Sequence, residues 1–121
     1  MKLSTVFTVN AILALLFGLG LALMPTTMAA LYGADLGAAG LFLGRLLGAA
    51  FIAIGLICWM AKDASGDQRP LVFSFFVEHL IGLVFAVMAQ LNGVVNSLGW
   101  SIVVIYLYLT LGYAYHQFIK S

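Results

Sequence analysis

The feature that most constrains this chain is the apolar run over residues 39–61, which is long enough to cross a lipid bilayer. A transmembrane helix needs about 20 predominantly apolar residues, because each residue adds about 1.5 Å to the length of a helix. Three further runs meet this requirement, at residues 5–24, 71–90 and 98–119. The connections between the runs are too short for a soluble domain. We therefore predict one all-α domain over residues 1–121, an integral membrane four-helix transmembrane bundle.

The composition supports a lipid environment for most of the chain. Of the 121 residues, 64% are hydrophobic and 7% are charged, whereas soluble domains contain about 45–50% apolar and about 25% charged residues. A soluble fold of this size buries too little surface to hide so many apolar side chains. A net charge of +1 without a basic cluster argues against nucleic acid as a partner. Motifs for a nucleophile, a metal or a nucleotide are missing, so we expect no catalytic residues, no metal and no cofactor.

The basic residues predict the orientation of the bundle. If the four runs alternate across the membrane, the basic residues outside the runs all lie on one side: Lys2, Lys62, Arg69 and Lys120. The loops of the other side contain no Lys or Arg and one acid, Asp35. Lys and Arg are enriched in cytoplasmic loops. We therefore expect both termini and the loop at 62–70 to lie in the cytoplasm.

The first run and the connection after it have more than one interpretation. The small residues near Ala29 are compatible with cleavage of a signal peptide, but the run is longer than the about 7–15 apolar residues of such signals. A retained helix is the favoured interpretation. The connection at 25–38 is weakly polar, and we expect a short interfacial helix there with Tyr32 as an anchor. Further interfacial aromatics are expected at Trp59, Trp100, Tyr113 and Tyr115.

A stripe of small residues follows one face of the second run, formed by Gly40, Gly44, Gly48 and Gly55. Residues four apart share a face of a helix, and small residues let two helices approach closely in lipid. Two interpretations stay open. The stripe packs against another helix of the same chain, or it forms the seam of a homodimer or of a larger membrane complex.

Arg45 is the only Lys or Arg side chain inside an apolar run. One interpretation is that its long stem reaches back to the outer head groups. The other is a buried ion pair with Glu78 in the third run, since the second and third helices are joined by a short connection and consecutive elements are usually neighbours. Charged side chains within membrane helices are rare and usually face the interior of the bundle.

Five polar side chains fall at a similar depth in three of the runs: Asn10, Glu78, His79, Thr110 and Tyr113. If their faces point inward, they form a cluster in the cytoplasmic half of the bundle. Such a cluster either fixes the register of the helices through hydrogen bonds or forms a proton or ligand site. The single cysteine, Cys58, is interpreted as a small buried hydrophobic residue.

Two short segments and the layout of the chain carry a resemblance to a known group of proteins. The segments are Leu31-Tyr32-Gly33 and Gly44-Arg45-Leu46-Leu47-Gly48-Ala49. With four apolar runs in 121 residues, the chain resembles small bacterial inner-membrane proteins that are DoxX-like or of unknown function. The resemblance implies a multi-pass protein of the inner membrane with a four-helix bundle. It implies no catalytic residues.

Two functions remain at this point. The favoured one is a non-enzymatic accessory or assembly protein whose partners are membrane lipids and other membrane proteins, because the short loops leave no room for a soluble catalytic site. The alternative is a small transporter or binder of a lipophilic or proton-coupled solute. In that alternative Glu78 is the protonatable group, Arg45 is its counter-charge, and His79 and Tyr113 line the site.

Overall fold

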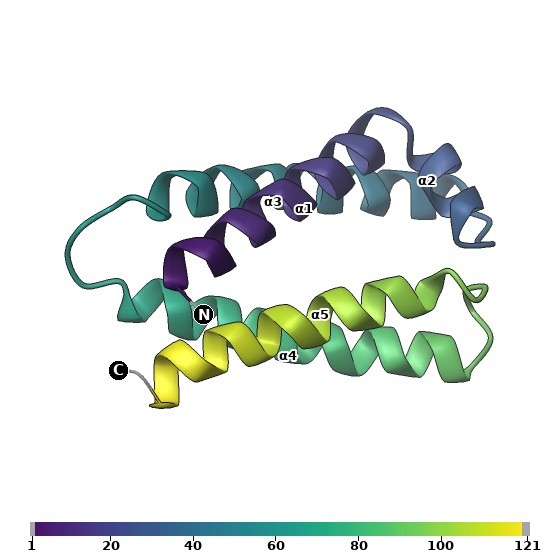
Figure 1. Ribbon diagram of the computed structural model, residues 1–121. Coiled ribbons are helices and arrows are strands. Elements are labelled where there is room, and N and C mark those ends of the chain that lie inside the picture. The colour runs from purple at the N-terminus through teal and green to yellow at the C-terminus, as the bar shows by residue number, and fades with distance from the viewer. Residues whose placement is uncertain (1, 120–121) are drawn as a thin grey trace.

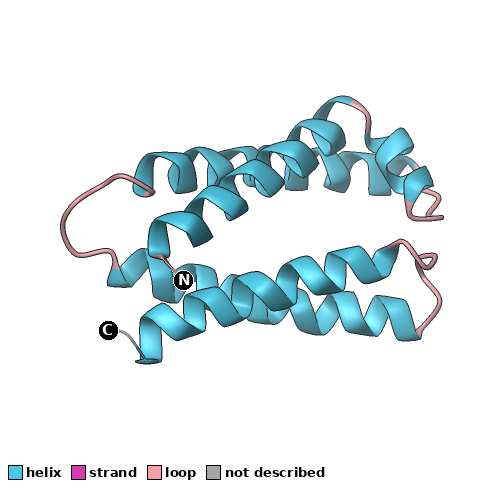
Figure 2. Cartoon of the chain, viewed as in Figure 1, coloured by secondary structure: helices cyan, strands magenta, loops and turns pink. Residues whose placement is uncertain are grey.

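The structure is a computed structural model that describes residues 2–119 of the chain, and Lys120 lies outside the described residues. All regular elements of the described part are helices (Figure 2). The long ones are α1 (Leu3–Leu23), α3 (Ala38–Ala61), α4 (Arg69–Leu91) and α5 (Gly99–Ala114), which continues through a π-helical turn, η1 (Tyr115–Ile119). Within residues 2–119, four helices are long and apolar enough to cross a membrane, counting α5 and η1 as one. The all-helical fold class is confirmed.

The long helices form two antiparallel pairs (Figure 1). Helix α1 lies along α3, and α4 lies along α5. Contacts between α1 and α5 join the two pairs, whereas α3 and α4 make almost no direct contact. The prediction that the second and third runs are neighbours is therefore wrong. The connection between α3 and α4 leads from one pair to the other, and the small-residue face of α3 is already covered by α1.

A short helix, α2 (Pro25–Leu31), forms in the first connection, with proline at its first turn where the missing amide is not needed. Tyr32 follows at the end of α2. The Tyr32 carbonyl accepts a hydrogen bond of 2.8 Å from the Asn96 amide. The Asn96 side chain donates to the Leu31 carbonyl at 3.1 Å. Asn96 thus ties the first connection to the last one, across the two helix pairs.

The hydrophobic core lies in the half of the bundle where α1 begins and α5 ends. Its centre is three aromatic rings from three helices, Phe7, Phe75 and Tyr113, with centroids 5.5–6.3 Å apart. The buried hydrophobic residues packed around this centre are Val6, Ala11, Cys58, Ala61, Val72 and Leu109. Every long helix contributes to this cluster. The two pairs are therefore held together at one end of the molecule.

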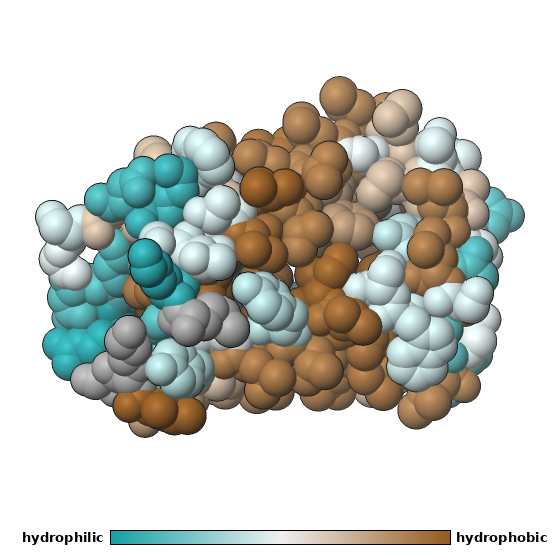
Figure 3. Space-filling model, viewed as in Figure 1, coloured by the Kyte–Doolittle hydropathy of each residue, from teal (hydrophilic) through white to brown (hydrophobic). Residues whose placement is uncertain are grey.

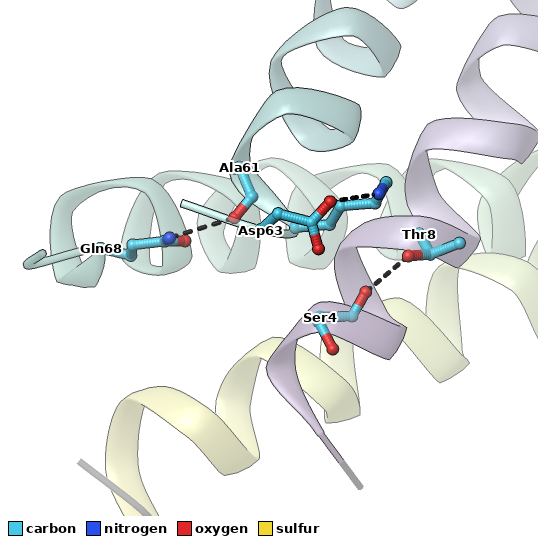
Figure 4. A network of polar contacts seen from close by, with 6 residues as sticks. Ser4, Thr8, Ala61, Asp63 and Gln68 are labelled. Atoms are coloured by element: carbon cyan, nitrogen blue, oxygen red, sulfur yellow. Dashed lines mark hydrogen bonds and ion pairs between the residues drawn. The ribbon is translucent and has the colours of Figure 1, made fainter. Parts of the chain in front are cut away.

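Polar contacts gather at that same end (Figure 4). Gln68 Nε2 donates to the Ala61 carbonyl at 3.0 Å, and the same carbonyl at the end of α3 accepts the Ala64 amide at 3.2 Å. Thr8 Oγ1 donates to the Ser4 carbonyl at 2.7 Å on the first turns of α1. On the whole surface in this view, hydrophilic residues cover the end with the loop at 62–68, and hydrophobic residues cover the middle (Figure 3). This banding is the pattern that a bilayer requires.

An exposed ion pair joins the loop before α4 to the first residue of that helix. Arg69 donates to both carboxylate oxygens of Asp67, through Nε and one terminal nitrogen, each at 2.9 Å. The hydrogen bonds from the Arg69 side chain and backbone lower the pKa of Asp67 from 3.8 to about 2. Both side chains face solvent, and a pair of this kind contributes little to stability.

Candidate functional site

A cavity of about 610 Å³ lies between the two helix pairs. Its lining comes from α1, α2, α3, α4 and α5, and it includes residues of the first and last connections. It therefore occupies the half of the bundle that the hydrophobic core leaves free. Cavities of about 300–1,000 Å³ are typical of small-molecule sites. Its volume and its mostly apolar lining together make this cavity the candidate site.

The cavity is apolar over most of its wall and polar at its inner end. Five aromatic side chains contribute to the wall: Phe17, Tyr32, Phe51, Phe85 and Tyr106. The polar lining residues in the membrane-spanning helices, apart from Tyr106, are Asn10, Glu78 and His79. Glu78 lies about 14 Å along α4 from its first residue, close to the middle of a membrane span. Among the Asp, Glu, Lys and Arg residues of the described chain, Glu78 alone lines this cavity.

Glu78 and His79 are in contact, but they do not form a hydrogen bond. Glu78 Oε2 lies 2.6 Å from His79 Nδ1, whereas the hydrogen-bond partner of that nitrogen is the Phe75 carbonyl at 2.8 Å. A carbonyl only accepts, so Nδ1 carries the proton. Glu78 Oε2 is buried and has no hydrogen bond within residues 2–119. The Glu78 side chain is 35% exposed and His79 is 5% exposed, so the carboxylate borders the cavity while the imidazole is packed behind it.

Behind this end of the cavity, Asn10 and Tyr113 form a buried hydrogen bond between α1 and α5. Asn10 Nδ2 donates to the Tyr113 hydroxyl at 2.8 Å. The Cys58 sulfur lies 3.8 Å from the same hydroxyl, so a third helix joins the contact. Tyr113 is fully buried, and its predicted place in an interfacial aromatic belt is wrong. Its ring packs against Phe7 and Phe75, which removes it from the membrane surface.

Four of the five residues of the predicted polar cluster contact another member of that cluster. They are either buried or border the cavity. Asn10 binds Tyr113, and the His79 ring lies 5.6 Å from the Tyr113 ring. Glu78 lies beside His79. Thr110, one turn before Tyr113 on α5, is buried, and its hydroxyl makes no hydrogen bond to the described residues. The sequence pattern missed Cys58 as a polar neighbour, because cysteine is usually a buried hydrophobic residue.

Arg45 does not belong to this site. Its side chain is exposed on α3, and it has no ion pair with any described residue. The ion pair with Glu78, which was one of the two interpretations of Arg45, is absent among the described residues because α3 and α4 belong to different helix pairs. Arg45 lies in the half of α3 away from the polar loop at 62–68, which agrees with the alternative that its stem reaches toward the outer head groups.

The glycine stripe of α3 is occupied within the chain. A Cβ on Gly48 would lie 2.7 Å from the Gly18 oxygen, and one on Gly55 would lie 3.1 Å from the Ala11 oxygen, so both glycines lie against the backbone of α1. Gly40 and Gly44 face side chains of the first connection, where an added Cβ would lie 3.3 and 3.8 Å, respectively, from the nearest atoms of Leu36. These contacts agree with packing inside one chain rather than with a homodimer seam.

Only part of the cavity lining could be predicted from the sequence. Its inner polar end follows from rare ionisable residues at membrane depth, which are easily recognised. Its outer wall includes Met28 and Tyr32 from the first connection and Val95 from the last. No periodic pattern marks these positions. No group of three or more His, Cys, Asp or Glu side chains suited to a metal ion occurs in the described part of the chain.

The fold and the site together define a class, a helical protein with four membrane-length helices and an apolar cavity that ends at a carboxylate. Comparisons with protein-family models, with curated proteins and with solved structures find no match for this chain. The function must therefore be argued from the site itself.

Proposed function

We propose that this is a small multi-pass protein of the inner membrane that binds a lipophilic molecule between its two helix pairs, without catalysing a reaction. The observation that carries the proposal is the cavity of about 610 Å³, apolar along its wall and closed by Glu78 and His79 at membrane depth. A lipophilic molecule reaches such a site from the bilayer, where it is already concentrated. The polar end orients it.

The accessory or assembly role favoured from the sequence has less support. Apolar side chains are exposed on every long helix, but this is expected of any bundle that faces lipid. The stripe residues Gly48 and Gly55 are covered by α1, so a homodimer or a larger complex would use another surface. The alternative function, a binder of a lipophilic solute, gains support. Glu78 lines the cavity, as that alternative requires, whereas Arg45 does not.

The orientation is part of the proposal. Lys2, Lys62 and Arg69 belong to the end of the molecule where α1 begins and α4 starts, and Asp35 belongs to the other end (Figure 1). By the preference of basic residues for cytoplasmic loops, the first end faces the cytoplasm. Labelling of Ser65→Cys by an impermeant thiol reagent, in inside-out but not in right-side-out vesicles, is the expected result. The reverse pattern would contradict this orientation.

The binding proposal is tested by filling the cavity. Ile102 on α5 lines it, whereas Val104 on the same helix is 63% exposed on the outer surface. We expect native mass spectrometry to detect one saturably bound molecule of lauramide, a neutral alkyl amide, on the wild-type protein and on Val104→Trp. Ile102→Trp should weaken this binding by about tenfold or more, which corresponds to about 1.4 kcal/mol. Equal binding by the two variants would refute the proposed site.

A further inference from the structure

The polar end of the cavity contains a carboxylate with no Lys or Arg side chain from residues 2–119 beside it, and its ionisable neighbour is His79, whose Nδ1 lies 2.6 Å from Glu78 Oε2. No Lys or Arg among the described residues lines the cavity, and Arg45 is exposed elsewhere on α3. The His79 Nδ1 proton is given to the Phe75 carbonyl rather than to Glu78. Glu78 Oε2 is buried without a hydrogen bond to the described part of the chain, and the rest of the carboxylate borders the cavity. An ionised carboxylate in an apolar environment is costly unless it is paired, so a ligand with a cationic head gains affinity by pairing with Glu78.

Aromatic rings line the cavity beside and beyond this carboxylate. Tyr106 packs directly over Gly82, which lies one turn beyond Glu78 on the same face of α4. The Tyr106 ring also lies 5.4 Å from the His79 ring. Farther along the wall are Phe51 and Phe85. Aromatic faces attract cations, and the attraction is stronger where water is excluded. The wall therefore favours a cation, as the carboxylate of Glu78 does.

The size and direction of the cavity restrict the ligand further. A volume of about 610 Å³ suits a drug-sized molecule and is too small for a whole two-chain phospholipid. From Glu78 the wall continues as apolar side chains toward Met28 and Val95 near the connections. A ligand with its head at Glu78 therefore has room for one apolar body in that direction.

We propose that the natural occupant is a small amphiphilic cation, with an ammonium-type head at Glu78 and a single apolar body along the aromatic wall. This inference rests on the proposed function and narrows its ligand class. Charge complementarity with Glu78 selects the head, and the apolar wall selects the body. Glu78 is a ligand-binding residue in this account, and Tyr106 supports it through its ring face.

The test compares three probes with the same alkyl chain and different head charges: dodecyltrimethylammonium, lauramide and laurate. Native mass spectrometry of the full-length protein in a neutral detergent gives the Kd of each probe. We expect the cation to bind about tenfold more tightly than the neutral amide, and the anion to bind most weakly. Glu78→Gln should remove the preference for the cation and leave the affinity for lauramide within about twofold.

Asp35→Asn is the matched control, because it removes an exposed acid in the connection between α2 and α3 and should leave the preference unchanged. Equal affinity for the three probes, or a preference that survives in Glu78→Gln, would refute the cation assignment while leaving the cavity proposal intact. Absence of saturable binding by any probe would refute both. Displacement of dodecyltrimethylammonium by phosphatidylethanolamine would refute the small amphiphile and identify a membrane lipid as the occupant.

Discussion

Tyr113 lies at the centre of the hydrophobic core, in the half of the molecule where α1 begins and α5 ends. Its ring contacts aromatic side chains of α1 and α4, and its hydroxyl accepts the Asn10 amide proton. The hydroxyl also lies within 3.8 Å of Cys58 on α3. One side chain of α5 thus touches all three of the other long helices. A buried polar group is tolerated here because it has a partner.

Removal of the Tyr113 hydroxyl should destabilise the protein without changing its fold. Tyr113→Phe leaves the Asn10 amide without its hydrogen-bond partner. We expect the free energy of unfolding to fall by about 1 kcal/mol. Interhelical hydrogen bonds in lipid contribute about 0.6 kcal/mol on average, and an unpaired buried group costs about 1–3 kcal/mol. Unfolding in mixed micelles measures this loss. Tyr108→Phe is the control, because the Tyr108 hydroxyl makes no hydrogen bond within residues 2–119, and its effect should stay within about 0.5 kcal/mol. Equal losses in the two variants would contradict the assigned role.

Asp67 should titrate well below an ordinary aspartate. Its pKa is lowered from 3.8 to about 2 by Arg69, so the carboxylate stays charged down to about pH 2. A lowered pKa in the folded state contributes stability that is present above about pH 4 and is lost as the pH falls through about 2. Carbon NMR of the labelled carboxyl measures the titration. In Arg69→Gln the midpoint should return toward 3.8; an unchanged midpoint would show that the ion pair does not cause the shift.

The relation between Arg45 and Glu78 could not be predicted from the sequence. Arg45 and Glu78 are rare charges at membrane depth, and rarity correctly singled out both. Pairing them required knowledge of which helices are neighbours. The close contact between α1 and α3 decides which helices are neighbours, and neither Arg45 nor Glu78 takes part in that contact. The contact between Asn10 and Tyr113 could be anticipated only in part: their similar depth in the apolar runs is visible in the sequence, whereas the inward direction of both side chains is shown by the structure.

At the scale of elements, α3 is defined by the face that it turns toward α1. Gly48 and Gly18 bring the two backbones together, and Gly55 admits the Leu15 side chain and the Ala11 carbonyl. In lipid, helix association depends on such close packing, because there is no hydrophobic drive between helices. The tight seam between α1 and α3 leaves α4 to pair with α5.

The glycines of α3 should differ sharply in their tolerance of a methyl group. A Cβ on Gly48 would lie 2.7 Å from both the Ala22 nitrogen and the Gly18 oxygen, and these backbone atoms cannot move independently of their helix. We expect Gly48→Ala to cost about 1–3 kcal/mol in unfolding free energy. Gly44→Ala has its nearest contact at 3.8 Å, so it should be neutral or stabilise by up to about 1 kcal/mol through helix propensity. Similar costs for both variants would contradict the seam between α1 and α3.

Elements were the most predictable level of this structure. Run length and apolarity located the four long helices to within a few residues, because a helix that crosses a bilayer needs a fixed length. A short helix in the first connection was also expected, and the structure places Pro25 in its first turn. The pairing of helices was not predictable. The glycine face of α3 showed that a helix packs closely against it, but nothing in the sequence identified α1 as that helix.

At the scale of the whole molecule, the two helix pairs meet at one end and separate toward the other. The core around Phe7, Phe75 and Tyr113 closes the end with the polar loop at 62–68. At the opposite end the pairs are linked by Asn96, which binds the backbone of Leu31 and Tyr32. The cavity lies between these two attachments. Such a hollow arises from the angle between pairs and therefore has no local signal in the sequence.

The most direct test of this account is photolabelling of the protein in nanodiscs with an alkyl diazirine, with the labelled residues mapped by mass spectrometry. Phe51 and Ile102 line the cavity, whereas Leu16 and Val104 are 63% exposed on the outer surface. We predict saturable labelling at the first two residues, suppressed by excess lauramide, and labelling at the last two that rises with probe concentration and is not suppressed. The same unsuppressed labelling at all four residues would contradict a binding cavity between the helix pairs.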